Sequence, residues 1–126
     1  NNLKQILWPV HCVQESEGSN FPSTLDIKAI NKIIYKGSNS QIDSYSGFYD
    51  NGKIRSTGLS DYLKIKNITS IDYVGLATEY CVKFTVFDSI DEGFKSRVIL
   101  KGIKGINVEE SNKTLKEMKS KGIDLL

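Results

Sequence analysis

The stretch that decides the fold is Ile71-Asp72-Tyr73-Val74-Gly75-Leu76, which runs directly into Ala77-Thr78-Glu79-Tyr80-Cys81. The first six residues form a largely apolar run, which is typical of a strand covered on both faces in a parallel sheet. Apolar side chains then recur at helical spacing, at Val82, Val86, Phe87, Ile90 and Phe94, up to a stop near Gly93. The start of a helix favours thiolate over thiol. We therefore interpret Cys81 as a nucleophile, with an inert core thiol as the alternative.

Strands and helices alternate along the rest of the chain. Asp50-Asn51-Gly52 predicts a tight turn, and a helix is expected after it because Leu59, Tyr62 and Leu63 fall at helical spacing. Arg97-Val98-Ile99-Leu100 predicts the next strand. Asn107 with Glu110 three residues later is a capping-box signature for a last helix, which Gly122 ends. This alternation indicates an α/β fold with a parallel sheet.

The first 46 residues are predicted to be mostly loop, because proline, glycine, serine and asparagine interrupt them. Ile33-Ile34-Tyr35 is the one strand candidate in this stretch. We expect a single domain over residues 1–126, because the length is close to the commonest domain size and no linker or repeat divides the chain. We also expect this domain to be incomplete at its N-terminal side, because the long lead-in has no strand of its own and begins with Asn1.

The composition narrows the classes of partner. The chain has 126 residues, of which 39% are hydrophobic and 25% charged, as is ordinary for a globular domain. A net charge of +2 without a basic run argues against nucleic acid, and no apolar stretch approaches the ~18 residues of a membrane span. With Cys12 and Cys81 as the two cysteines, free thiols in the cytoplasm are favoured over a disulfide. We expect a small-molecule ligand, and the sequence leaves open whether the chain forms a homo-oligomer.

Five blocks of the sequence together resemble the nicotinamidase/pyrazinamidase branch of the isochorismatase-like hydrolases. They are Trp8-Pro9-Val10-His11-Cys12-Val13, Gly18, Lys36-Gly37, Asp43-Ser44-Tyr45-Ser46-Gly47-Phe48, and Gly75-Leu76-Ala77-Thr78-Glu79-Tyr80-Cys81-Val82-Lys83. The blocks keep the order and approximate spacing of the family over essentially the whole chain. The resemblance implies a three-layer α/β/α, Rossmann-like fold around a six-stranded parallel sheet, of which the N-terminal strands are absent from this chain.

The same resemblance implies an activity: hydrolysis of nicotinamide to nicotinate and ammonia through a cysteine thioester, for NAD salvage. Cys81 matches the nucleophile, and Lys36 matches the lysine whose compact ammonium stabilises the thiolate and the developing oxyanion. The resemblance also implies an oxyanion hole formed by the backbone N–H groups of Cys81 and Ala77, next to a cis peptide bond between Leu76 and Ala77. On the bare sequence, Lys36 is otherwise an ordinary surface lysine.

Further residues match ligand-binding positions of the family. His11 matches a metal-binding histidine, while Trp8 and Tyr45 match aromatic residues that line the pyridine pocket. The implied cofactor is a divalent metal, zinc first, with manganese or iron as alternatives because imidazole suits all of them. Without the resemblance, a histidine with ordinary hydrogen bonds and aromatic side chains in the core would explain these residues. Cys12 is expected to be a small buried residue beside His11, with a catalytic role as the alternative.

Some parts of the family pattern are missing. The segment that carries the general-base aspartate and the segment with the other metal ligands have no counterpart, and none of Asp26, Asp43, Asp50 and Asp61 is in the position of that base. Many members of the family have an acidic residue at the end of the strand where this chain has Lys101-Gly102-Ile103. Glu79 is expected to be a solvent-facing helix cap, with proton transfer as the alternative. Two other functions stay open: another amide, carbamoyl or vinyl-ether hydrolase of this fold, and an inactive fragment that serves as a binding or oligomerising module.

Overall fold

The computed structural model describes residues 3–126 and divides into two units, one ending at Ile33 and one comprising Ile34–Leu126. The first unit is mostly irregular, as predicted, with two one-turn 3-10 helices, η1 (Glu17–Ser19) and η2 (Ile27–Ala29). None of its described side chains is buried, so this stretch has no core of its own. The predicted strand at residues 33–35 is wrong, because these residues pair with no other strand in the described chain.

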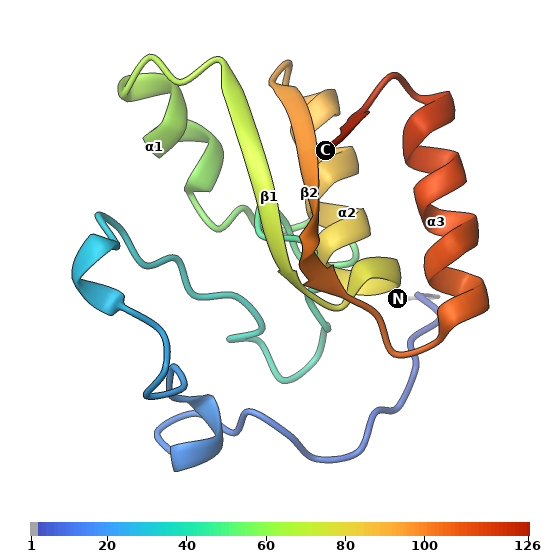
Figure 1. Ribbon diagram of the computed structural model, residues 1–126. Coiled ribbons are helices and arrows are strands. Elements are labelled where there is room, and N and C mark those ends of the chain that lie inside the picture. The colour runs from blue at the N-terminus through green and yellow to red at the C-terminus, as the bar shows by residue number, and fades with distance from the viewer. Residues whose placement is uncertain (1–2) are drawn as a thin grey trace. The chain divides into compact units, whose positions relative to one another are not determined.

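The second unit is built around a parallel sheet with the strand order β1-β2-β3. One helix follows β1 and another follows β2, and these two helices, α2 and α3, lie on the same side of the sheet (Figure 1). Across the described residues, no helix is long and apolar enough to cross a membrane. In chain order the elements are α1 (Leu59–Ile65), β1 (Ser70–Leu76), the π-helical turn η3 (Thr78–Val82), α2 (Lys83–Asp91), β2 (Lys95–Lys104), α3 (Val108–Ser120) and β3 (Asp124–Leu125).

The hydrophobic core lies between the sheet and the helices α2 and α3. It consists of Tyr73, Val82, Val86, Val98, Met118 and Ile123, all of which are buried. Tyr73 and Val98 are paired neighbours on β1 and β2, which explains why both side chains point to this face. The prediction that β1 is covered on both faces is wrong for the described residues, since Val74 is 63% exposed and Leu76 is 72% exposed.

The helix boundaries agree with the predicted start and stop signals, with one exception. Asn107 caps α3 by accepting a hydrogen bond from the Glu110 N–H at 3.1 Å, and Gly122 follows the helix with a φ of +80°. Gly93 likewise follows α2 with a φ of +90°, a conformation that glycine adopts without strain. Phe94 is the exception, because it lies beyond the helix and stacks on Phe48 at 6.0 Å between ring centroids.

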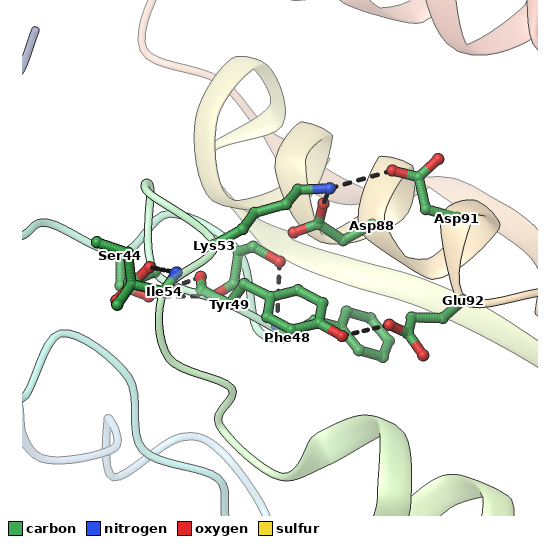
Figure 2. A network of polar contacts seen from close by, with 10 residues as sticks. Ser44, Phe48, Tyr49, Lys53, Ile54, Asp88, Asp91 and Glu92 are labelled. Atoms are coloured by element: carbon green, nitrogen blue, oxygen red, sulfur yellow. Dashed lines mark hydrogen bonds and ion pairs between the residues drawn. The ribbon is translucent and has the colours of Figure 1, made fainter. Parts of the chain in front are cut away.

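A polar network fastens the segment before α1 to α2 (Figure 2). Lys53 Nζ lies 2.7 Å from Asp88 and 3.1 Å from Asp91 on α2, and these carboxylates raise the pKa of Lys53. The Tyr49 hydroxyl donates a hydrogen bond to Glu92, the C-terminal capping residue of α2. The predicted turn at residues 50–52 is confirmed by a 2.9 Å hydrogen bond from the Lys53 N–H to the Asp50 carbonyl.

Candidate active site

Cys81 lies in η3, immediately beyond the C-terminal end of β1. Functional sites in parallel α/β sheets form at this end of the strands. The peptide bond between Leu76 and Ala77 is cis, which is the geometry that the resemblance implied. The Ala77 carbonyl accepts the N–H groups of Tyr80 at 3.0 Å and Val82 at 3.1 Å, so the chain turns tightly around the cysteine. Cys81 is a free, half-buried thiol at the start of a helix.

Thr85 joins this turn to the loop that contains Tyr45. Its hydroxyl donates a 2.5 Å hydrogen bond to the Cys81 carbonyl and accepts a 2.9 Å hydrogen bond from the Gly47 N–H. A side chain on Gly47 would bring its Cβ to 3.3 Å from Thr85 Cγ2, so the loop approaches the helix closely here. Sequence reasoning missed Thr85. Its spacing of four residues from Cys81 is the signal that could have identified it, because threonine in a helix often bonds to the carbonyl four residues earlier.

Three aromatic rings meet at the helix start that contains Cys81. The ring of Tyr45 meets Tyr80 edge-on at 5.6 Å between centroids and lies 5.4 Å from the ring of Phe84. Tyr80 and Phe84 are four residues apart, so they share one side of the helix start that contains Cys81. The structure therefore brings the predicted ligand-binding Tyr45 to the same part of the molecule as the predicted nucleophile, and it adds two aromatic residues that had been left unassigned.

Lys36 forms a hydrogen bond to the loop that contains Tyr45 and not to the thiol of Cys81. Its ammonium donates a 2.5 Å hydrogen bond to the carbonyl of Ser44, and no hydrogen bond joins it to Cys81 in the described structure. Lys36 also borders a hollow of about 210 Å³, whose other lining residues include Ser44, Asp50 and Thr57 but not Cys81. The predicted partnership of Lys36 with Cys81 therefore rests on the sequence motif.

Glu79 is not the solvent-facing cap that was predicted. Its side chain is buried and accepts hydrogen bonds from the N–H of Ile106 at 2.8 Å, the N–H of Asn107 at 2.7 Å and the hydroxyl of Ser111 at 3.2 Å. Burial alone would raise the pKa of Glu79, but these hydrogen bonds outweigh that effect and lower the pKa below its ordinary value. The carboxylate therefore caps α3 instead of its own helix.

His11 and Trp8 belong to the unit that ends at Ile33. His11 is exposed, and its Nδ1 lies 2.6 Å from the carbonyl oxygen of Pro9. Because a carbonyl only accepts hydrogen bonds, Nδ1 is the donor in this contact. In the neutral imidazole the lone pair is then on Nε2, which is the arrangement that a metal-binding histidine has. Trp8 is half-buried. Cys12 is exposed, so its predicted burial is wrong, and the reason is that its stretch of chain forms no core.

The described residues do not complete a metal site. Residues 3–126 contain no group of three or more histidine, cysteine, aspartate or glutamate side chains that could hold a metal ion. A protein zinc site uses three or four such ligands. His11 thus has the right chemistry for one ligand of a divalent metal but cannot hold the ion by itself.

Comparison with known proteins places these features in a family. The isochorismatase domain model matches residues 1–126. The chain is 43% identical to the nicotinamidase of Escherichia coli K12 over 127 residues, which cover 99% of this chain and 60% of that protein. The crystal structure of PnC1 from L. infantum in complex with nicotinate superimposes with a TM-score of 0.92 at 32% identity, and it covers 95% of this chain and 60% of the other.

A further solved structure is that of the Pyrococcus horikoshii pyrazinamidase in complex with zinc, with a TM-score of 0.84 and 33% identity over 95% of this chain and 63% of the other. The chain thus spans about three fifths of the length of these three relatives. Three observations agree on the family: the match over all 126 residues, the parallel α/β fold, and the cysteine beyond the end of β1. The chain therefore belongs to the isochorismatase family.

Proposed function

We propose that the protein containing this chain is a nicotinamidase, which hydrolyses nicotinamide to nicotinate and ammonia in NAD salvage. The observation that carries the proposal is the position of Cys81 in η3, beyond the C-terminal end of β1, in a chain that is 43% identical to a nicotinamidase. The relative from L. infantum was solved with nicotinate, the product of this reaction. Free thiols at both cysteines fit a reducing compartment, and we assign the protein to the cytoplasm.

In the proposed reaction, the Cys81 thiolate attacks the amide carbon of nicotinamide and a carbon–sulfur bond forms while the carbonyl electrons move to oxygen. The backbone N–H groups of Ala77 and Cys81 are the donors that we assign to this oxyanion, and one such donor contributes ~3 kcal/mol of transition-state stabilisation. Collapse of the intermediate breaks the carbon–nitrogen bond, and ammonia leaves after taking up a proton. Water then attacks the thioester, which releases nicotinate and restores the thiol.

We assign the remaining predicted residues to binding and charge stabilisation. The contacts of Tyr45 with Tyr80 and Phe84, two residues of the helix start that contains Cys81, support a role for Tyr45 in holding the flat pyridine ring next to the nucleophile. Trp8 is assigned to the same pocket from its sequence motif. Lys36 is assigned to stabilising the thiolate, a function that suits its compact ammonium group.

We also propose that the intact protein binds a divalent metal, zinc first with manganese or iron as alternatives, and that His11 supplies one ligand. The lone pair left on Nε2 of His11 supports this, and the relative from Pyrococcus horikoshii was solved with zinc. When bound, such an ion supplies a Lewis acid that can hold the pyridine nitrogen of a substrate. No step of the reaction above depends on it, because the described residues do not form a complete site.

The proposed activity is tested by ammonia release from nicotinamide, measured with the intact protein and its Cys81→Ala variant. A Cys12→Ala variant is the matched control, because it removes the other thiol, which is exposed and outside the proposed chemistry. We expect turnover that Cys81→Ala abolishes and Cys12→Ala preserves. Full activity of Cys81→Ala, or faster turnover of a vinyl ether such as isochorismate than of nicotinamide, would contradict the proposal.

A further inference from the structure

Glu79 is a buried carboxylate only two residues before Cys81, and three of its hydrogen bonds come from a distant part of the chain. Its Oε1 accepts both the Ile106 and Asn107 N–H groups, at 2.8 and 2.7 Å, and its Oε2 accepts the Ser111 hydroxyl at 3.2 Å. All three donors lie 27 or more residues further along the chain, at the junction of β2 and α3. The carboxylate therefore fastens the turn that contains Cys81 to a second loop at the same end of the sheet.

The cap of α3 shows that this link replaces a local alternative. In a complete capping box, the glutamate three residues after the cap would bond back to the N–H of the cap residue. Here Asn107 does accept the Glu110 N–H, but the Glu110 carboxylate pairs with Lys113 at 2.7 Å. The N–H of Asn107 is taken by Glu79 instead. The start of α3 thus depends on a residue of the cysteine turn.

The backbone around the carboxylate is shaped to admit it. A Cβ added to Gly105 would lie 2.4 Å from Glu79 Oε2 and 1.8 Å from Ser111 Oγ, so any side chain at this position would occupy the space of the carboxylate or its donor. Glycine is therefore needed here for close approach and not for its backbone angles. Glu79, Gly105 and Ser111 fit together as one packed unit.

We propose that Glu79 is a positioning residue for Cys81: its three hydrogen bonds to the β2–α3 junction hold the η3 turn in the geometry that presents the thiol and the neighbouring backbone N–H groups to a substrate. This inference rests on the proposed function of Cys81 as the nucleophile. Because both carboxylate oxygens are already engaged by these donors, Glu79 acts as an anchor and does not exchange protons with the substrate.

Three variants of the intact protein separate an anchor from a proton-transfer group and from a residue that only stabilises the fold. Glu79→Ala removes all three hydrogen bonds. Glu79→Gln keeps an oxygen that can accept both N–H groups and an amide that can donate to Ser111. Met118→Ala is the matched control, because it opens a cavity at a fully buried position of α3 and leaves the three hydrogen bonds of Glu79 in place.

Each variant is assayed in two ways: steady-state nicotinamide hydrolysis, and the rate of alkylation of Cys81 by iodoacetamide, followed by peptide mass spectrometry so that Cys12 is counted separately. We expect Glu79→Ala to lower kcat and the alkylation rate by about tenfold or more with KM changed less than about threefold, because small displacements of a reacting group are costly. Glu79→Gln and Met118→Ala should stay within about threefold of the wild type in both assays, and Glu79→Gln should keep the wild-type pH profile.

The outcomes are distinguishable. A Glu79→Gln variant as impaired as Glu79→Ala, or one that loses a limb of the pH profile, would overturn the anchor role. Equal effects of Glu79→Ala and Met118→Ala would show a purely structural role and would also overturn it. If Glu79→Ala does not fold, the Ser111→Ala variant tests the anchor role instead. It removes one of the three hydrogen bonds of Glu79, so alkylation of Cys81 should slow about threefold. An unchanged rate refutes the proposal. If the wild type does not hydrolyse nicotinamide, the proposed function fails, and the alkylation rates still test the position of Glu79.

Discussion

Replacing Glu92 by glutamine should loosen the segment that holds Tyr45 against α2. The Glu92 carboxylate accepts hydrogen bonds from the Tyr49 hydroxyl, from Ser60 Oγ at 2.5 Å and from Lys64 Nζ at 2.7 Å (Figure 2 shows the bond to Tyr49). It therefore fastens both the loop before α1 and α1 itself to the end of α2. Glutamine keeps the shape of the side chain and removes its charge.

The magnitude follows from the pKa of Glu92. Hydrogen bonds from Lys64 first, then from Ser60 and Tyr49, lower this pKa from the ordinary 4.5 to about 2. At 1.36 kcal/mol per pKa unit, this difference corresponds to at most about 3.4 kcal/mol of stability. The Glu92 side chain is 18% exposed and that of Lys64 is 53% exposed, so water screens part of the interaction. We expect Glu92→Gln to lower the free energy of unfolding by about 2 kcal/mol at pH 7.

The pH dependence has a definite sign. Above about pH 4.5 the carboxylate is ionised in both the folded and the unfolded chain, and its contribution is complete. Between pH 4.5 and about 2 the unfolded chain binds the proton first, so stability falls as the pH falls. Glu92→Gln should lack this component, and its difference from the wild type should shrink towards pH 2. Urea unfolding at several pH values measures the difference in the free energy of unfolding between this variant and the wild type. Glu109→Gln is the control, because Glu109 is an exposed glutamate of α3, and its stability should stay within about 0.5 kcal/mol of the wild type. An unchanged stability of Glu92→Gln at pH 7 would refute the anchoring role.

Three further perturbations test other contacts. Gly105→Ala should lower the free energy of unfolding by roughly 2–4 kcal/mol in urea because its Cβ collides with Ser111 and Glu79, whereas Gly18→Ala, whose nearest contact would be 3.7 Å, should be near neutral. Thr85→Val removes the hydrogen bonds to Cys81 and Gly47 at constant shape, so we expect a loss of about 1–3 kcal/mol and a raised KM for nicotinamide; unchanged values of both would contradict the link. Lys36→Met should slow the iodoacetamide reaction of Cys81 at pH 7 about tenfold, and a wild-type rate would exclude Lys36 from stabilising the thiolate.

The sequence predicted β1, β2 and the helices around them, because strong local signals determined them, but it did not predict the two-residue strand β3. The apolar run at residues 71–76, the Asn107 cap and the glycines after both long helices each act within a few residues of chain. Burial was harder to predict, since it depends on partners far away in the sequence. β1 has one open face in the described residues although its composition is that of a covered strand, and Cys12 is exposed although cysteine is usually buried.

The candidate site was predicted only in part for the same reason. The cysteine turn and Tyr45 were identified from their motifs, and the structure brings Tyr45 into contact with the rings of Tyr80 and Phe84. The partners of Glu79 lie more than 25 residues away, so a local reading could interpret it only as a cap of its own helix. The bond from Gly47 to Thr85 and the bond from Tyr49 to Glu92 likewise join distant segments, and no spacing rule within one element predicts them.

Cys81 is proposed to carry the acyl group of the substrate during turnover. Rapid acid quenching of the intact protein with nicotinamide, followed by proteolysis and mass spectrometry, detects this intermediate, because a thioester survives at low pH. We predict a nicotinoyl group on the peptide that contains Cys81 and none on the peptide that contains Cys12 or in the Cys81→Ala variant. Rapid nicotinate formation by the Cys81→Ala variant, or an acyl group on another residue, would contradict the account.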